Sequence, residues 1–147
     1  MMKPLLLAML ALLGAACSLP PEEELPVPFT TIAMGERSGI LRPKNVVVRT
    51  ADEWARLWKL HDAGDAGRRP SIDFSRDMVI AVFRGQRPTA GYGVRIMDVR
   101  QTPDELQVHV RERRPDTRTV LAQVLTCPYV MIRLPKKDLP VRFVFGD

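Results

Sequence analysis

Short apolar runs separated by polar stretches recur along most of this chain, and their spacing predicts strands more often than helices. Residues 78–83 form an unbroken apolar run of the buried-strand type. Residues 92–97 alternate apolar with small or polar side chains, the period of a strand with two unlike faces. Glycine and proline interrupt both patterns between these runs. We therefore predict a β-hairpin whose connection, residues 85–91, is a structured loop.

One helix is expected in the first half of the chain. Thr50 and Glu53 have the spacing of a capping box, in which each side chain satisfies a backbone N–H at the start of a helix. Trp54, Leu57 and Trp58 follow at helical spacing and are expected to form a core stripe. Together with the runs above, further strands are expected at 29–34, 46–49, 106–111, 129–134 and 141–145.

The resulting fold class is α+β. We expect a mainly antiparallel β-sheet of six or seven strands, with the helix packed on one face. A chain of 147 residues has room for one such domain with a real core. We assign this domain to residues 29–147.

The first 28 residues are expected to lie outside that domain. Residues 1–16 have a positive start, an apolar stretch and small residues, as in an export signal. Cys17 follows at the position that a lipoprotein signal modifies with lipid, although Gly14 stands where Leu is more usual. Residues 17–28, rich in Pro and Glu, are interpreted as a tether. The prediction is an exported protein anchored to the bacterial cell envelope membrane; cleavage after Ala16 by ordinary signal peptidase would instead give a secreted or periplasmic soluble protein.

The net charge limits the classes of partner to be considered, and the cysteine content limits the possible disulfides. The net charge is +5, and setting aside Lys3 and the tether glutamates makes the remainder more basic. Export argues against nucleic acid as the counterpart and favours anionic lipids, envelope polymers or an acidic protein. Cys127 is the one cysteine inside the predicted domain, so a disulfide to Cys17 requires that Cys17 carries no lipid.

Candidate catalytic groups are few. His61 continues the helical stripe and is expected to face the edge of the core, whereas His109 falls on the polar side of a strand. Neither has metal-ligand spacing to another His or to Cys127, so we expect no metal and no cofactor. Cys127 with His109 as its base is the one nucleophilic pair to consider, against a buried structural Cys127. We predict a protein that is not an enzyme.

The loop before residue 92 is the best candidate for partner binding. Positive charge, a rigid turn and an aromatic side chain lie together there, and Arg and Tyr are enriched at the centres of protein interfaces. The alternative is that Tyr92 packs inward and the glycines only shape the turn. The predicted partner-binding residues are Gln86, Arg87, Pro88, Thr89, Gly91 and Tyr92.

These residues are similar to the C-terminal domain of the PrcB family, named for a subunit of an exported bacterial protease complex. The resemblance implies a non-enzymatic accessory that binds or stabilises a subtilisin-like protease. Ala90 stands where the family commonly has a second Gly. The matching segments are Ser38-Gly39-Ile40, Glu53-Trp54, Leu57-Trp58, Asp73-Phe74, residues 79–83, residues 85–96 and Pro128-Tyr129.

Two alternatives use the same region differently. Residues 88–92 resemble the Pro-Thr-Thr-Gly-Tyr loop of chagasin-type inhibitors of cysteine proteases, which are immunoglobulin-like β-domains, and imply direct protease inhibition. An envelope ligand-binding module that uses the basic stretch 111–118 is the third hypothesis. The identity of the partner and the oligomeric state do not follow from the sequence.

Overall fold

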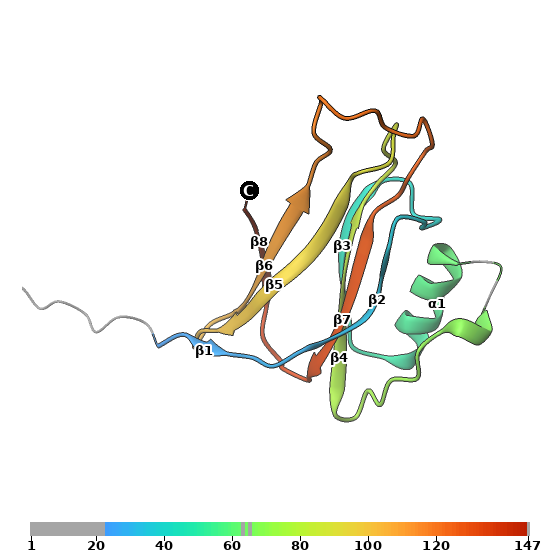
Figure 1. Ribbon diagram of the computed structural model, residues 1–147. Helices are drawn as coiled ribbons and strands as arrows, with labels where there is room; N and C mark the ends of the chain where they lie inside the picture. Colours follow the sequence, from blue (N-terminus) through green and yellow to red (C-terminus); the bar gives the residue numbers. More distant parts are fainter. Residues whose placement is uncertain (1–22, 63, 65, 147) are drawn as a thin grey trace, which may run out of the picture.

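The computed structural model describes residues 23–62, 64 and 66–146. These residues contain eight strands, one α-helix and one short 3₁₀-helix (Figure 1). The elements in chain order are β1 (Leu25–Pro26), β2 (Thr30–Gly35), β3 (Pro43–Val48), α1 (Ala51–His61), η1 (Ala66–Arg68), β4 (Asp77–Arg84), β5 (Gly93–Gln101), β6 (Leu106–Arg113), β7 (Tyr129–Pro135) and β8 (Val141–Gly146).

The molecule is built in three layers. One sheet has the strand order β1-β5-β6-β8 and the other has the order β2-β7-β4-β3. Apolar side chains from the facing surfaces of both sheets form one core cluster. Helix α1 covers the other face of the β2-β7-β4-β3 sheet and forms a second cluster with it (Figure 1). The predicted α+β class, with one helix on one face of a sheet, is therefore confirmed.

Strand β4 explains the unbroken apolar run in the sequence. Met78, Ile80 and Val82 point into the core between the sheets. The alternate residues Val79 and Phe83 point to the other side, into the core under α1. A strand that buries both faces has no polar phase, so its sequence shows no alternation.

The start of α1 follows the predicted capping box. The Glu53 N–H donates to Thr50 Oγ1 at 3.2 Å, and the Thr50 N–H donates to Glu53 Oε2 at 3.3 Å. Glu53 Oε2 also accepts from the Arg49 N–H at 2.9 Å. This backbone hydrogen bond from Arg49 is the main reason that the pKa of Glu53 is lowered. Trp54, Leu57 and Trp58 are buried against the sheet, as expected.

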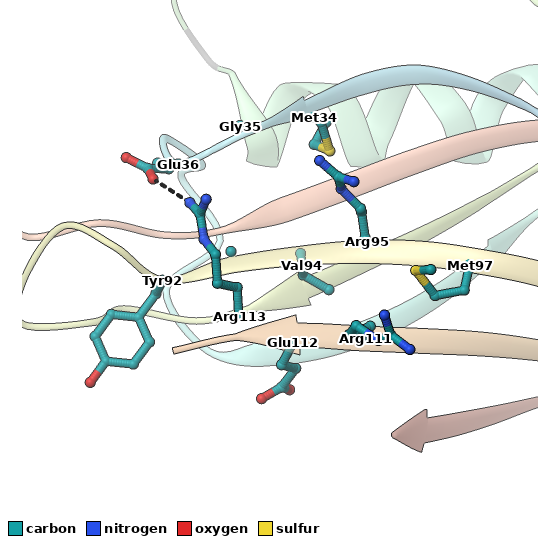
Figure 2. Close-up of a pocket in the computed structure, with 11 residues that line it drawn as sticks. Met34, Gly35, Glu36, Tyr92, Val94, Arg95, Met97, Arg111, Glu112 and Arg113 are labelled. Carbon is teal, nitrogen blue, oxygen red and sulfur yellow. Dashed lines mark ion pairs between the residues drawn. The ribbon is translucent and has the colours of Figure 1, made fainter. Parts of the chain in front are cut away.

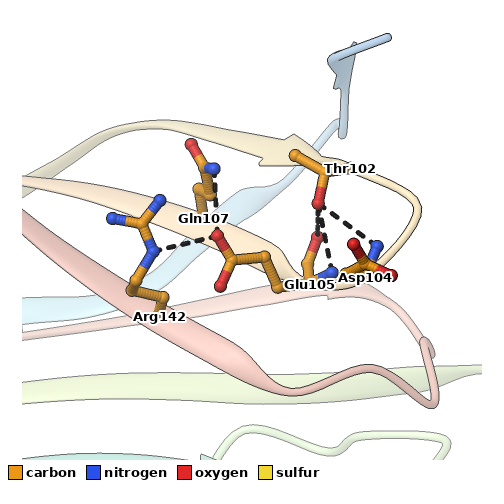
Figure 3. A network of polar contacts seen from close by, with 5 residues as sticks. All are labelled: Thr102, Asp104, Glu105, Gln107 and Arg142. Atoms are coloured by element: carbon orange, nitrogen blue, oxygen red, sulfur yellow. Dashed lines mark hydrogen bonds and ion pairs between the residues drawn. The ribbon is translucent and has the colours of Figure 1, made fainter. Parts of the chain in front are cut away.

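The β5–β6 hairpin is closed by a hydrogen-bonded turn. Thr102 Oγ1 accepts from the N–H groups of Asp104 and Glu105 (Figure 3). Glu105 Oε1 then accepts from Arg142 Nε of β8 at 2.9 Å and from Gln107 Nε2 at 3.1 Å. Arg142 is the first cause of the lowered pKa of Glu105. This network joins the turn to the start of β8, which runs parallel to β6.

The predicted hairpin around residues 85–91 is wrong. Strand β4 pairs with β3 and β7, whereas β5 pairs with β1 and β6, so the two strands lie in different sheets. The connection crosses from one sheet to the other. Neighbouring runs joined by a glycine-rich loop look the same in the sequence whether the loop turns within one sheet or passes between two.

Three further details differ from the expectation. There are eight strands in the described residues instead of six or seven, and β6 and β8 form a parallel pair within a mainly antiparallel fold. Leu25–Pro26, assigned to the tether, pairs with β5, and the following Val27 is buried in the core. The edge of a sheet accepts Pro because only one side of such a strand needs hydrogen bonds. The predicted export signal and Cys17 lie outside the described residues.

Candidate functional site

The predicted binding loop is clamped at one end of the sandwich. Arg87 and Thr126 exchange backbone hydrogen bonds, with N–O distances of 2.7 and 3.0 Å. Thr126 Oγ1 donates to the Thr89 carbonyl at 2.9 Å, and the Ala90 N–H donates to the Ala122 carbonyl at 3.1 Å. Figure 1 shows this loop beside the long segment that connects β6 to β7. The loop therefore has a fixed shape that is set by a distant part of the chain.

Two glycines make that shape possible. Gly85 and Gly91 have φ angles of +73° and +93°, in the region that side chains with a Cβ rarely adopt. A Cβ on Gly85 would lie 2.8 Å from Pro43 Cδ, and one on Gly91 would lie 2.8 Å from Pro115 Cβ. The loop thus packs closely on the chain at both of its ends.

The structure brings the predicted binding residues together but exposes them unequally. Gln86 and Pro88 are exposed, while Thr89 and Gly91 are partly buried. Tyr92 is also partly buried, and the Arg87 guanidinium carbon lies 5.5 Å from the centre of its ring. The cation–π contact holds the charge and the aromatic ring as one unit. Tyr92 is neither sealed in the core nor fully exposed.

Tyr92 is one of the residues that line an open concavity of about 550 Å³, whose other lining residues come from both sheets (Figure 2). Its walls come from the last residues of β2, the first half of β5 and the last residues of β6. Two exposed methionines line it, Met34 on β2 and Met97 on β5, which are 52% and 45% accessible. Exposed flexible thioethers are common at adaptable binding surfaces. This concavity was not predicted from the sequence, because its two sides are distant in the chain.

Arginines dominate the charge of the concavity. Arg95 and Arg111 are directly opposite each other on β5 and β6. Within the described part of the chain, neither has an ion-pair partner. Arg113 lies across Gly93, where a Cβ would be 3.4 Å from its guanidinium, and its Nη2 is 3.7 Å from Glu36 Oε1 (Figure 2). The surface therefore carries uncompensated positive charge beside apolar side chains.

A second polar group, missed from the sequence, surrounds His61. Its Nδ1 lies 2.9 Å from Ser38 Oγ, and this hydroxyl oxygen accepts a hydrogen bond from the Ile40 N–H at 3.1 Å. The ring packs edge-on against Tyr129, with ring centres 4.2 Å apart. Burial lowers the pKa of His61 and raises that of Tyr129. Ser38, His61 and Tyr129 are too far apart in the sequence for their spacing to indicate that they meet. The sequence predicted only the position of His61 on the helix.

Cys127 and His109 are the nucleophile and base that were considered as a pair from the sequence. Cys127 is buried and lines a surface depression with His61, and its N–H donates to the Glu36 carbonyl at 2.7 Å. His109, the base considered for Cys127, instead lies 3.7 Å from Asp98 on the neighbouring strand. The described residues contain no cluster of three or more His, Cys, Asp or Glu side chains suited to a metal ion.

The helices in the described part of the chain are all too short or too polar to cross a membrane. No curated protein and no solved structure matches the chain. The family described as PrcB C-terminal matches residues 78–135, which run from β4 through the clamped loop and the concavity to the end of β7. The resemblance inferred from the sequence is thereby confirmed over residues 78–135, which match the family described as PrcB C-terminal.

Proposed function

We propose that this chain is a non-enzymatic exported lipoprotein whose PrcB-like domain binds a protein partner. The partner class suggested by the family name is a secreted protease of the subtilisin type, for which the chain would serve as an accessory or stabilising subunit. Lipid attached to Cys17 would hold the domain at the cell envelope membrane.

One observation carries this proposal. Tyr92 lies half-buried under Arg87 at the junction of a clamped loop and an open, arginine-lined concavity. Aromatic and arginine side chains held in place by their surroundings lose little entropy on binding, and they are typical centres of protein interfaces. The match of the PrcB C-terminal family to this same region supports a role shared with that family.

The test is recovery of partners from detergent-solubilised membranes with the tagged full chain. Arg87→Ala and Tyr92→Ala are expected to lose the partner. Arg56→Ala, an exposed arginine on α1, is the matched control and is expected to retain it. Equal recovery with all three variants would reject the loop as the contact. Thermal unfolding of each variant verifies that the fold is retained.

Two further measurements address the remaining parts of the proposal. Mass spectrometry of the mature N-terminus distinguishes a lipid-modified Cys17 from an unmodified end. A panel of serine and cysteine proteases assayed with the purified protein separates an accessory from an inhibitor, since inhibition at micromolar concentration would favour the chagasin-like alternative.

A further inference from the structure

One side of β5 lacks a neighbouring strand over most of its length. Strand β1 pairs only with Gln101 and Arg100, and the Val27 N–H donates to the Val99 carbonyl at 2.8 Å. In the described ranges, no other strand pairs with that side of residues 93–98. An open strand edge of this kind is a template for pairing with another chain.

The register identifies which backbone groups face the open side. Because the Val99 carbonyl accepts from the β1 side, Val99 does not exchange hydrogen bonds with Val108 on β6. The register of β5 shifts between Ile96 and Asp98, so the alternation is counted along β6, where every second residue lacks hydrogen bonds to β5. Residues 110 and 112 follow Val108 at that spacing, and the same therefore holds for their pairs with Ile96 and Val94. The N–H and C=O groups of Val94 and Ile96 therefore point to the open edge.

The open edge faces an uncovered part of the other sheet. Strand β5 contacts β7 across the sandwich, and β2 lies next to β7 at the edge of its sheet. Because β5 lies opposite β7, a strand placed on the open side of β5 would lie opposite β2. Strand β1 fills this place only at Leu25–Pro26. The concavity in Figure 2 is the remainder of this position, with Met34 exposed at its side.

Charge identifies the occupant. Arg95 and Arg111 are directly opposite, an arrangement that destabilises a sheet when no acidic group compensates it. A second copy of this chain added at the same edge would bring its own Arg95 and Arg111 to this surface and increase the repulsion. A segment that carries carboxylates would remove it.

We propose that an extended acidic segment of a protein partner adds to β5 as a further strand, with its backbone paired to Val94 and Ile96. Its carboxylates at alternate positions lie beside Arg95, with Arg111 one strand farther away on the same face, and the residues between them face Met34. This inference rests on the proposed function in that the occupant is a protein, and it names the conformation and charge of the segment that the partner supplies.

The probes are blocked synthetic peptides of about nine residues, a common strand length. One alternates Val with Glu and a second alternates Val with Lys. Two further Val-Glu peptides carry N-methyl groups on the odd or on the even residues. Amide exchange and chemical shifts of the isotope-labelled full chain report binding. The acidic peptide is expected to slow exchange at Val94 and Ile96, the basic peptide is not, and only one of the two methylated peptides is expected to bind.

Charge variants complete the test. Arg95→Glu is expected to weaken binding of the Val-Glu peptide by about ten-fold or more, as expected when one partner of a charge pair at an interface is reversed. Arg56→Glu changes the net charge equally but lies on α1, and is expected to leave the affinity unchanged. Equal weakening by both variants, equal binding of acidic and basic peptides, or an acidic peptide that leaves exchange at Val94 and Ile96 unchanged would overturn the inference.

The outcome separates this inference from the proposed function. If the acidic peptide does not bind but Arg87→Ala still loses the partner from membranes, strand addition is rejected and the loop contact stands. If the acidic peptide binds and Arg87→Ala retains the partner, strand addition stands and the loop is rejected as the contact.

Discussion

His61 Nδ1 lies 2.9 Å from Ser38 Oγ inside the layer between α1 and its sheet. Burial is the main cause of the lowered pKa of this imidazole, and the nearby charge of Asp62 acts in the opposite direction. The folded protein therefore holds His61 neutral at pH values where the unfolded chain, with an ordinary value of 6.5, already binds a proton.

The free energy of unfolding is expected to fall as the pH falls below 6.5, toward the lower pKa of the folded state. The contribution is fully present above 6.5. Urea unfolding at several pH values between 7.5 and 5 measures it. His61→Phe should flatten the dependence in this window, and His109→Gln should retain it. A slope that persists in His61→Phe would assign the effect to other groups.

Gly85→Ala is expected to destabilise the fold by at least about 1–2 kcal/mol, because a Cβ is disfavoured at a φ of +73° and would also clash with Pro43. Gly146→Ala is the matched control, since its Cβ would meet nothing within 4 Å. Chemical unfolding of both variants provides the comparison. Equal stability of the two would show that the turn adopts another conformation at residue 85.

Thr50→Ala is expected to lower the free energy of unfolding by about 1 kcal/mol, because the Glu53 N–H loses its acceptor at the start of α1. Thr50→Ser keeps the hydroxyl group and should remain near the original stability. Thermal unfolding followed by circular dichroism distinguishes them. If Ser is as harmful as Ala, the methyl group of Thr50, not its oxygen, carries the effect.

Arg111→Glu is expected to raise stability by about 0.2–1 kcal/mol, because it replaces a like-charged pair with Arg95 by an opposite-charged one. The gain should shrink as salt is added, because the pair is solvent-exposed. Arg142→Glu should have the opposite effect, since Arg142 donates to Glu105. Chemical unfolding at low and high salt tests both. A loss of stability in Arg111→Glu would mean that Arg95 and Arg111 do not repel in the free protein.

Local patterns determined much of the fold from the sequence. The capping box and the tryptophan stripe correctly predicted α1 and the face it buries. The unbroken run at 78–83 correctly indicated a buried strand, because both faces of β4 are covered. These features depend on residues that are close in the chain, where spacing alone is informative.

The pairing of segments that are distant in the chain could not be predicted from the sequence. Pairing of β4 and β5 with strands of different sheets depends on partners many residues away, so the predicted hairpin failed. Leu25–Pro26 has no alternation to mark it as a strand and is ordered by the edge of β5. The concavity is likewise a product of sheet order; the sequence named Tyr92 and the basic stretch that begins at residue 111 separately, without indicating that they line the same surface.

Strand β7 lies between β2 and β4, so in the described part of the chain it joins β2 to the rest of that sheet, and it covers the edge of β4 that β3 does not pair with. A nascent chain therefore exposes one edge of the apolar strand β4 until residues 129–135 have been synthesised. Such long-range pairing slows folding and produces intermediates that are prone to aggregate. Shortened versions that stop before residue 129 are consequently expected to aggregate or to be degraded, and refolding from denaturant should be slow compared with that of helical domains of this size.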